Sequence, residues 1–119
     1  MMAILSSHTL NSVDGTHAGG IRVSISQIGV NSERTVLIGS ATDAGGRFKE
    51  TIALSEADTQ CSFEMVLQTG EYFLEQDLPR SGMQILKEVV VRFEMPEVDG
   101  HYHIPLMLSP NSYSVWWSS

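Results

Sequence analysis

Near the C-terminus the chain reads His101-Tyr102-His103-Ile104-Pro105-Leu106-Met107-Leu108-Ser109-Pro110, and His101 to Ser109 is expected to form an extended strand. Successive side chains of an extended strand point to opposite faces. One face of this strand is apolar and predicts a protein core; it carries Tyr102, Ile104, Leu106 and Leu108. The other face carries His101, His103, Pro105 and Met107. This second face must meet solvent, a partner subunit or a substrate.

The rest of the chain repeats the pattern of short strands between turn residues. We predict further strands at residues 4–10, 21–26, 36–41, 62–68, 89–95 and 112–117. Ile28 falls on the opposite face from Ile25, which predicts a bulge or a strand end. Residues 42–47 form a glycine-rich turn, and residues 70–77 form one short helix ended by residues 78–82. The pattern predicts an all-β, mostly antiparallel sandwich with one short helix.

Length and composition fit a single domain over residues 1–119, with 42% hydrophobic and 18% charged residues. The net charge of −7 argues against nucleic-acid or anionic-membrane partners, which need clustered basic residues. No stretch has the roughly 20 apolar residues of a membrane span. Cys61 is the only cysteine. The N-terminus lacks the pattern of a secretory signal, so we expect a cytoplasmic protein.

Three histidines are the candidate functional residues: His8, His101 and His103. Imidazoles on one strand face suit proton transfer near neutral pH or metal binding, although such a pair is also found in purely structural roles. A zinc site from the three histidines is the weaker interpretation, because the sequence offers no cue for groups that would orient the ligand rings. His17 lies in a glycine-rich segment and is expected to be a surface residue.

Two other features point to a ligand. Arg47 follows a glycine-rich turn, and its guanidinium can grip a carboxylate or an amide-derived anion, although a solvated turn residue is the usual role of such an arginine. Trp116 and Trp117 are adjacent, so one indole can enter the core while the other remains on the opposite face. An interface or a stacked planar ligand would explain the second indole.

Three motifs together resemble the 5-hydroxyisourate hydrolases, the transthyretin-like proteins of purine catabolism. The motifs are Leu5-Ser6-Ser7-His8-Thr9-Leu10, Asp43-Ala44-Gly45-Gly46-Arg47-Phe48 and the decapeptide from His101, which is the most specific. The resemblance spans nearly the whole chain. It implies a transthyretin-like fold assembled as a homotetramer, a dimer of dimers whose active sites lie in the channel between the dimers. No cofactor is implied.

The resemblance also implies roles for individual residues. By matching position, His8, Arg47 and His103 correspond to the catalytic residues of the family, and His101 to a histidine that lines the site. The family typically ends Tyr-Arg-Gly-Ser, whereas this chain ends Trp116-Trp117-Ser118-Ser119. Ser119 is retained. Trp117 replaces the arginine and, by strand parity with Ser119, is expected to lie in or beside the substrate site.

The function implied is hydrolysis of 5-hydroxyisourate to 2-oxo-4-hydroxy-4-carboxy-5-ureidoimidazoline in urate degradation. His103 is the expected general base, with His8 orienting water or substrate and Arg47 binding the carbonyl oxygens. Ser119 is expected to position substrate or relay a proton. The sequence does not decide which of His8 and His103 is the base. A diverged enzyme for another heterocycle and a non-catalytic ligand carrier are the alternative hypotheses.

Overall fold

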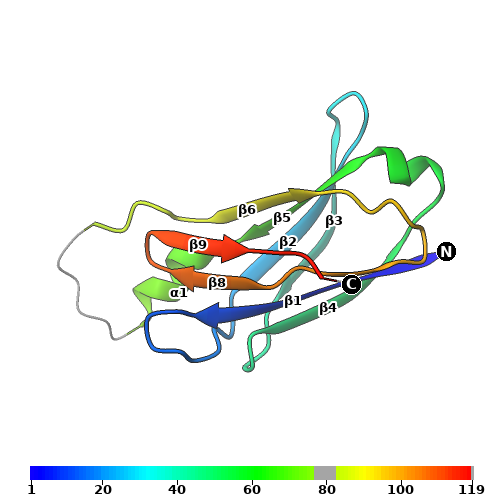
Figure 1. The fold of residues 1–119 in the computed structure, drawn as a ribbon. Coiled ribbons are helices and arrows are strands. Elements are labelled where there is room, and N and C mark those ends of the chain that lie inside the picture. Colours follow the sequence, from blue (N-terminus) through cyan, green and yellow to red (C-terminus); the bar gives the residue numbers. More distant parts are fainter. Residues whose placement is uncertain (77–82, 119) are drawn as a thin grey trace.

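The computed structural model describes residues 1–76 and 83–118 and has two β-sheets packed face to face, which confirms the predicted sandwich (Figure 1). The strands are Met2–Asn11 (β1), Arg22–Ile28 (β2), Arg34–Ala41 (β3), Arg47–Ala53 (β4), Ser62–Leu67 (β5), Val89–Phe93 (β6), His101–His103 (β7), Leu106–Ser109 (β8) and Ser112–Val115 (β9). The α-helix is Thr69–Leu74 (α1), and Ala57–Gln60 (η1) forms a short 3-10 helix.

The strand β1 is central to one of the two sheets. That sheet has the order β4-β1-β8-β9, with β7 also paired to β1, and the other has the order β3-β2-β5-β6. The pairing of β1 with β4 is antiparallel, whereas its pairing with β7 and β8 is parallel. The edge strands β6 and β9 lie on the same side of the sandwich (Figure 1).

The core lies between the sheets and is built from the inward face of each strand. The largest fully buried side chains include Leu5 and Leu106 from the first sheet and Ile25 and Phe63 from the second. Each such side chain contributes about 1.5–3 kcal/mol by leaving water. The four residues predicted to form the core face of the 101–109 stretch are all buried: Tyr102, Ile104, Leu106 and Leu108.

Two irregularities follow from local sequence. The pairing of β2 with β3 shifts register between Ile25 and Ser26, where Leu37 of β3 is the extra residue, and β2 ends at the buried Ile28, so the predicted bulge or strand end is confirmed. The predicted continuous strand 101–109 is instead two strands, β7 and β8. Pro105 lies between them and has no N–H to donate to β1.

Other expectations differ from the structure. The strand β4 was not predicted, because the run Lys49-Glu50-Thr51 hides the alternation between the buried residues Phe48 and Ile52. The predicted helix 70–77 begins one residue earlier and ends at Leu74. Residues 78–82, expected to end it, lie outside the described residues. The predicted strand 112–117 ends at Val115.

The inward face of β1 is partly polar, and its hydroxyl groups bond to neighbouring segments. Ser7 Oγ donates to the carbonyl of Ile104 at 2.6 Å. Thr9 Oγ1 lies 2.7 Å from the carbonyl of Ala18 and 3.1 Å from that of Gly46. Both hydroxyls are buried, so they would be costly to leave unpaired. These bonds fix the position of β1 relative to the segments that contain Ile104, Ala18 and Gly46.

Candidate functional site

The outward face of the sheet around β1 carries four of the predicted site residues. His8 pairs with Arg47 of β4, and Ser6 pairs with His103 of β7. Ile4 pairs with His101 in the same register. Residues directly opposite one another on paired strands place their side chains on the same face. His8, Arg47, His101 and His103 therefore share the outer face of one sheet.

Ser6 joins two of the histidines. Its Oγ lies 2.8 Å from Nδ1 of His103 and 3.4 Å from Nε2 of His101. A hydroxyl can donate one hydrogen bond and accept others, so Ser6 can link the protonation of the two rings. Ser6 was not among the predicted site residues. The signal was present, because in a strand at residues 4–10 Ser6 shares a face with His8.

His8 makes two contacts through one nitrogen. Its Nε2 lies 3.1 Å from the carbonyl oxygen of Gly45 and 2.9 Å from Nδ1 of His17, and the two rings stack with centroids 5.0 Å apart. Burial lowers the pKa of His8, and the nearby Arg47 guanidinium and the His17 and His103 rings lower it further, against the opposing effect of the Gly45 carbonyl. His8 is therefore biased toward the neutral form.

His17 was expected to be a plain surface residue, and this expectation was incomplete. Its side chain is exposed, but it contacts His8. The contact depends on the loop after β1 folding back so that Leu10 and His17 form an antiparallel bridge. No local sequence pattern signals this approach.

Arg47 is held by its backbone and leaves its side chain available. The predicted turn is confirmed: Asp43 Oδ1 accepts hydrogen bonds from the backbone N–H groups of Gly45 and Arg47, each at 2.9 Å. Gly46 has a φ of 74°, which glycine adopts without strain. Within residues 1–76 and 83–118, the Arg47 guanidinium has no hydrogen bond or ion pair. Its five donors are free for a ligand.

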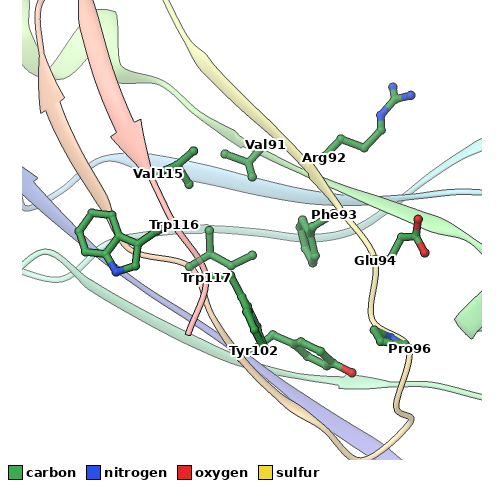
Figure 2. Close-up of a pocket in the computed structure, with 10 residues that line it drawn as sticks. Val91, Arg92, Phe93, Glu94, Pro96, Tyr102, Val115, Trp116 and Trp117 are labelled. Atoms are coloured by element: carbon green, nitrogen blue, oxygen red, sulfur yellow. The ribbon is translucent and has the colours of Figure 1, made fainter. Parts of the chain in front are cut away.

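The two tryptophans are placed differently from the expectation. Ser118 and His103 form an antiparallel bridge, and Leu106 pairs with Val115. This register sets Trp117 beside Ile104, on the core side, and Trp116 on the side of the histidines. Trp117 lines a groove with Phe93 and Tyr102, and Figure 2 shows Trp116 directed away from Phe93.

Neither indole enters the core, contrary to the prediction for one of them. Trp116 is 46% exposed and Trp117 is 61% exposed. The reason is that β9 is an edge strand and the two sheets are open between β6 and β9. Within one chain, Trp117 lies away from the histidines. Ser119, the last predicted site residue, lies outside the described residues.

The described residues set limits on two other interpretations. In the part of the chain that the structure describes, no group of three or more His, Cys, Asp or Glu side chains is arranged to hold a metal ion. Across residues 1–76 and 83–118, no helix has the length and apolar character needed to cross a bilayer. The chemistry that these described residues offer is that of imidazoles, a hydroxyl and one free guanidinium on an open sheet face.

Comparisons with known proteins identify the family of the chain. The HIUase/Transthyretin family matches residues 5–117. The 5-hydroxyisourate hydrolase of Halalkalibacterium halodurans is 28% identical over 119 residues, which cover all of both chains. The chain belongs to the HIUase/Transthyretin family.

Solved structures of both branches of the family superpose on the chain. The Klebsiella pneumoniae 5-hydroxyisourate hydrolase is 25% identical, with a TM-score of 0.74 over 98% of this chain and 99% of the other. Transthyretin from Sparus aurata is 27% identical, with a TM-score of 0.75 over 96% and 95%. The hydrolase and the transthyretin share this fold, so only the residues of the site can distinguish between the two functions.

Proposed function

We propose that the chain hydrolyses 5-hydroxyisourate to 2-oxo-4-hydroxy-4-carboxy-5-ureidoimidazoline in urate degradation. Water forms a new C–O bond at a ring carbonyl, the adjacent C–N bond breaks, and the products are a carboxylate and an N–H group. The observation that carries the proposal is the cluster of His8, Arg47, His101 and His103 on one open sheet face. The names of the full-length relatives support the substrate.

His103 acts as the general base in this mechanism. With Nδ1–H donating to Ser6 Oγ, the Nε2 atom of His103 carries the lone pair that takes a proton from the attacking water. The hydroxyl of Ser6 then accepts from His103 in both protonation states of the ring. This arrangement keeps the ring orientation fixed while its charge changes.

Arg47 and His8 act on the substrate from the neighbouring strand positions. The free guanidinium of Arg47 binds the carbonyl oxygens and stabilises the negative charge that develops as water adds. His8, biased toward its neutral form, orients water or substrate. His101 lines the site, and Ser119 positions substrate or relays a proton. Trp116, rather than Trp117, is the indole on this face.

The assembly proposed is a homotetramer formed as a dimer of dimers. Among residues 1–76 and 83–118, β6 and β9 are edge strands with no partner on their outer side, and they carry exposed apolar side chains, among them Val90, Tyr113 and Val115. Such edges favour pairing with a second copy. The histidine face would then lie in the channel between two dimers, closed off from bulk water. We propose the cytoplasm as the compartment, because a single cysteine suits a reducing environment.

A direct turnover measurement tests the proposed function. Urate oxidase acting on urate generates 5-hydroxyisourate, whose decay is followed by ultraviolet absorbance with and without the purified chain. We expect the chain to accelerate the decay well above the spontaneous rate, which is subtracted. Binding of the substrate with no acceleration would favour the carrier hypothesis and contradict the proposal.

The rate should rise with pH from the acidic side. Neutral imidazole is needed both to take the proton and to orient the reactants. The pKa of His8 is lowered from its ordinary value of 6.5, so the protonated form of His8 dominates only below that lowered pKa. Loss of activity through His8 should therefore occur below pH 6.5.

The measurement is kcat/KM from about pH 4.5 to 8.5, corrected for spontaneous decay. A His8→Asn variant serves as the control, because it should lose the part of the acidic limb that His8 causes. A profile that stays flat across this range while the substrate still binds would contradict a role for neutral histidine.

A further inference from the structure

The contact between His8 and His17 has a defined chemical direction. The carbonyl oxygen of Gly45 can only accept a hydrogen bond, and it lies 3.1 Å from Nε2 of His8. Nε2 of His8 must therefore carry the proton. Nδ1 of His17, which lies 2.9 Å from the same nitrogen, then accepts from it. One N–H is shared between two acceptors.

The other nitrogen of His8 is left unprotonated by this arrangement. A neutral imidazole carries one proton, so protonation of Nε2 makes Nδ1 the lone-pair nitrogen. Among residues 1–76 and 83–118, Nδ1 of His8 has no hydrogen-bond partner. The ring thus offers an acceptor to water or to a substrate N–H.

We propose that His17 is a positioning residue for His8, which holds the His8 ring in the Nε2–H tautomer and leaves Nδ1 free to accept a proton or hydrogen bond. The inference rests on the proposed function insofar as it concerns turnover. His17 acts through His8 and is not itself required to contact the substrate. The stacking of the two rings restricts the rotation of His8 as well.

The charges around His8 favour the same state. Arg47 from β4, His103 from β7 and His17 from the loop all disfavour a positive charge on His8, and the Gly45 carbonyl opposes them. A proton on Nδ1 of His17 would face the N–H of His8, donor against donor. The hydrogen bond between His8 and His17 therefore forms only while Nδ1 of His17 carries no proton.

Two substitutions separate the hydrogen bond from the ring stacking. His17→Phe keeps an aromatic ring but removes the acceptor. His17→Asn removes the ring but places an amide oxygen where Nδ1 lies, so it retains an acceptor. Val13→Ala, an exposed change in the same loop, is the matched control. Thermal unfolding of each variant checks that the loop substitution leaves the fold intact.

The main readout is the tautomer of His8, measured by nitrogen-15 NMR on the full chain labelled at histidine and assigned with His8→Asn. We expect Nε2–H to dominate in the wild type, in Val13→Ala and in His17→Asn. In His17→Phe only the longer contact to the Gly45 carbonyl, at 3.1 Å, still favours Nε2–H, so a larger share of the Nδ1–H tautomer than in the wild type is expected. For 5-hydroxyisourate, the kcat of His17→Phe should fall about three- to tenfold, with KM within about twofold of the wild type.

The NMR measurement needs no substrate, so it separates the two proposals. A tautomer shift in His17→Phe, in a chain that fails to turn over 5-hydroxyisourate, would support positioning by His17 and contradict the proposed function. An unchanged tautomer in His17→Phe, or a wild-type ring protonated at Nδ1, would overturn the role of His17. A fall in kcat in His17→Asn equal to the fall in His17→Phe would also overturn the role of His17.

Discussion

Replacing His103 with Asn is expected to lower kcat for 5-hydroxyisourate by about 10²–10⁴-fold, the usual loss when one acid–base group is removed. The Asn amide can still hydrogen-bond to Ser6 and so replace the contact of 2.8 Å between Ser6 Oγ and His103 Nδ1. An amide cannot take a proton from water near neutral pH. The fall should therefore appear in kcat and much less in KM. The measurement is initial turnover in the in situ urate oxidase assay.

His101→Asn is the matched comparison for His103→Asn. Its Nε2 lies 3.4 Å from Ser6 Oγ, a longer contact than that of His103, so a smaller loss is expected. Circular dichroism and sedimentation of both variants verify fold and assembly. Near-wild-type turnover in folded His103→Asn would remove His103 from the role of base. An equal loss in both variants would instead indicate that the two rings act as one unit through Ser6.

Arg47→Ala is expected to lower kcat/KM by about 10²–10³-fold, comparable to the loss of one donor that stabilises an oxyanion. The side chain has no ion pair or hydrogen bond within the described residues, so its removal should leave the free energy of unfolding nearly unchanged. Arg47→Lys should recover part of the activity, because an ammonium keeps the charge but not the planar set of donors.

Lys49→Ala provides the control for Arg47. Lys49 lies two residues further along β4 and pairs with Ser6, so it shares the outer face. We expect its removal to change kcat/KM by about twofold or less, in line with the small effects of exposed charges. If Lys49→Ala and Arg47→Ala were equally damaging, the general positive charge of this face would be responsible, not the geometry of the guanidinium.

The parts of the fold that the sequence predicted are those governed by alternation of side chains. The core face from Tyr102 to Leu108 and the bulge before Ile28 both follow from period-two patterns that burial enforces. The strand β4 escaped prediction because Glu50 interrupts the pattern between Phe48 and Ile52. Pro105 divides a strand whose side chains keep their alternation, so the faces were right although the element boundaries were not.

The candidate site was predictable only where it lies on strands. His8, His101 and His103 have their directions set by alternation, and the pairing of β1 with β4 and β7 adds Arg47 to them. His17 lies in a loop, where alternation carries no information and only the tertiary path of the chain brings the ring to His8. The directions of Trp116 and Trp117 were assigned from residue 119 backward, whereas the bridge between Ser118 and His103 fixes them.

The buried hydroxyls of β1 give the two faces of the strand different tolerances to substitution. The bonds from Ser7 and Thr9 end at Ile104, Ala18 and Gly46, each the immediate chain neighbour of His103, His17 or Arg47. Changes on the inward face would disturb the alignment of several active groups at once. The outward side chains of Ile4 and Leu10 take no part in these hydrogen bonds. New specificities on this scaffold are therefore best sought by varying Ile4 and Leu10, while Ser6, His8 and the inward hydroxyls of β1 are kept.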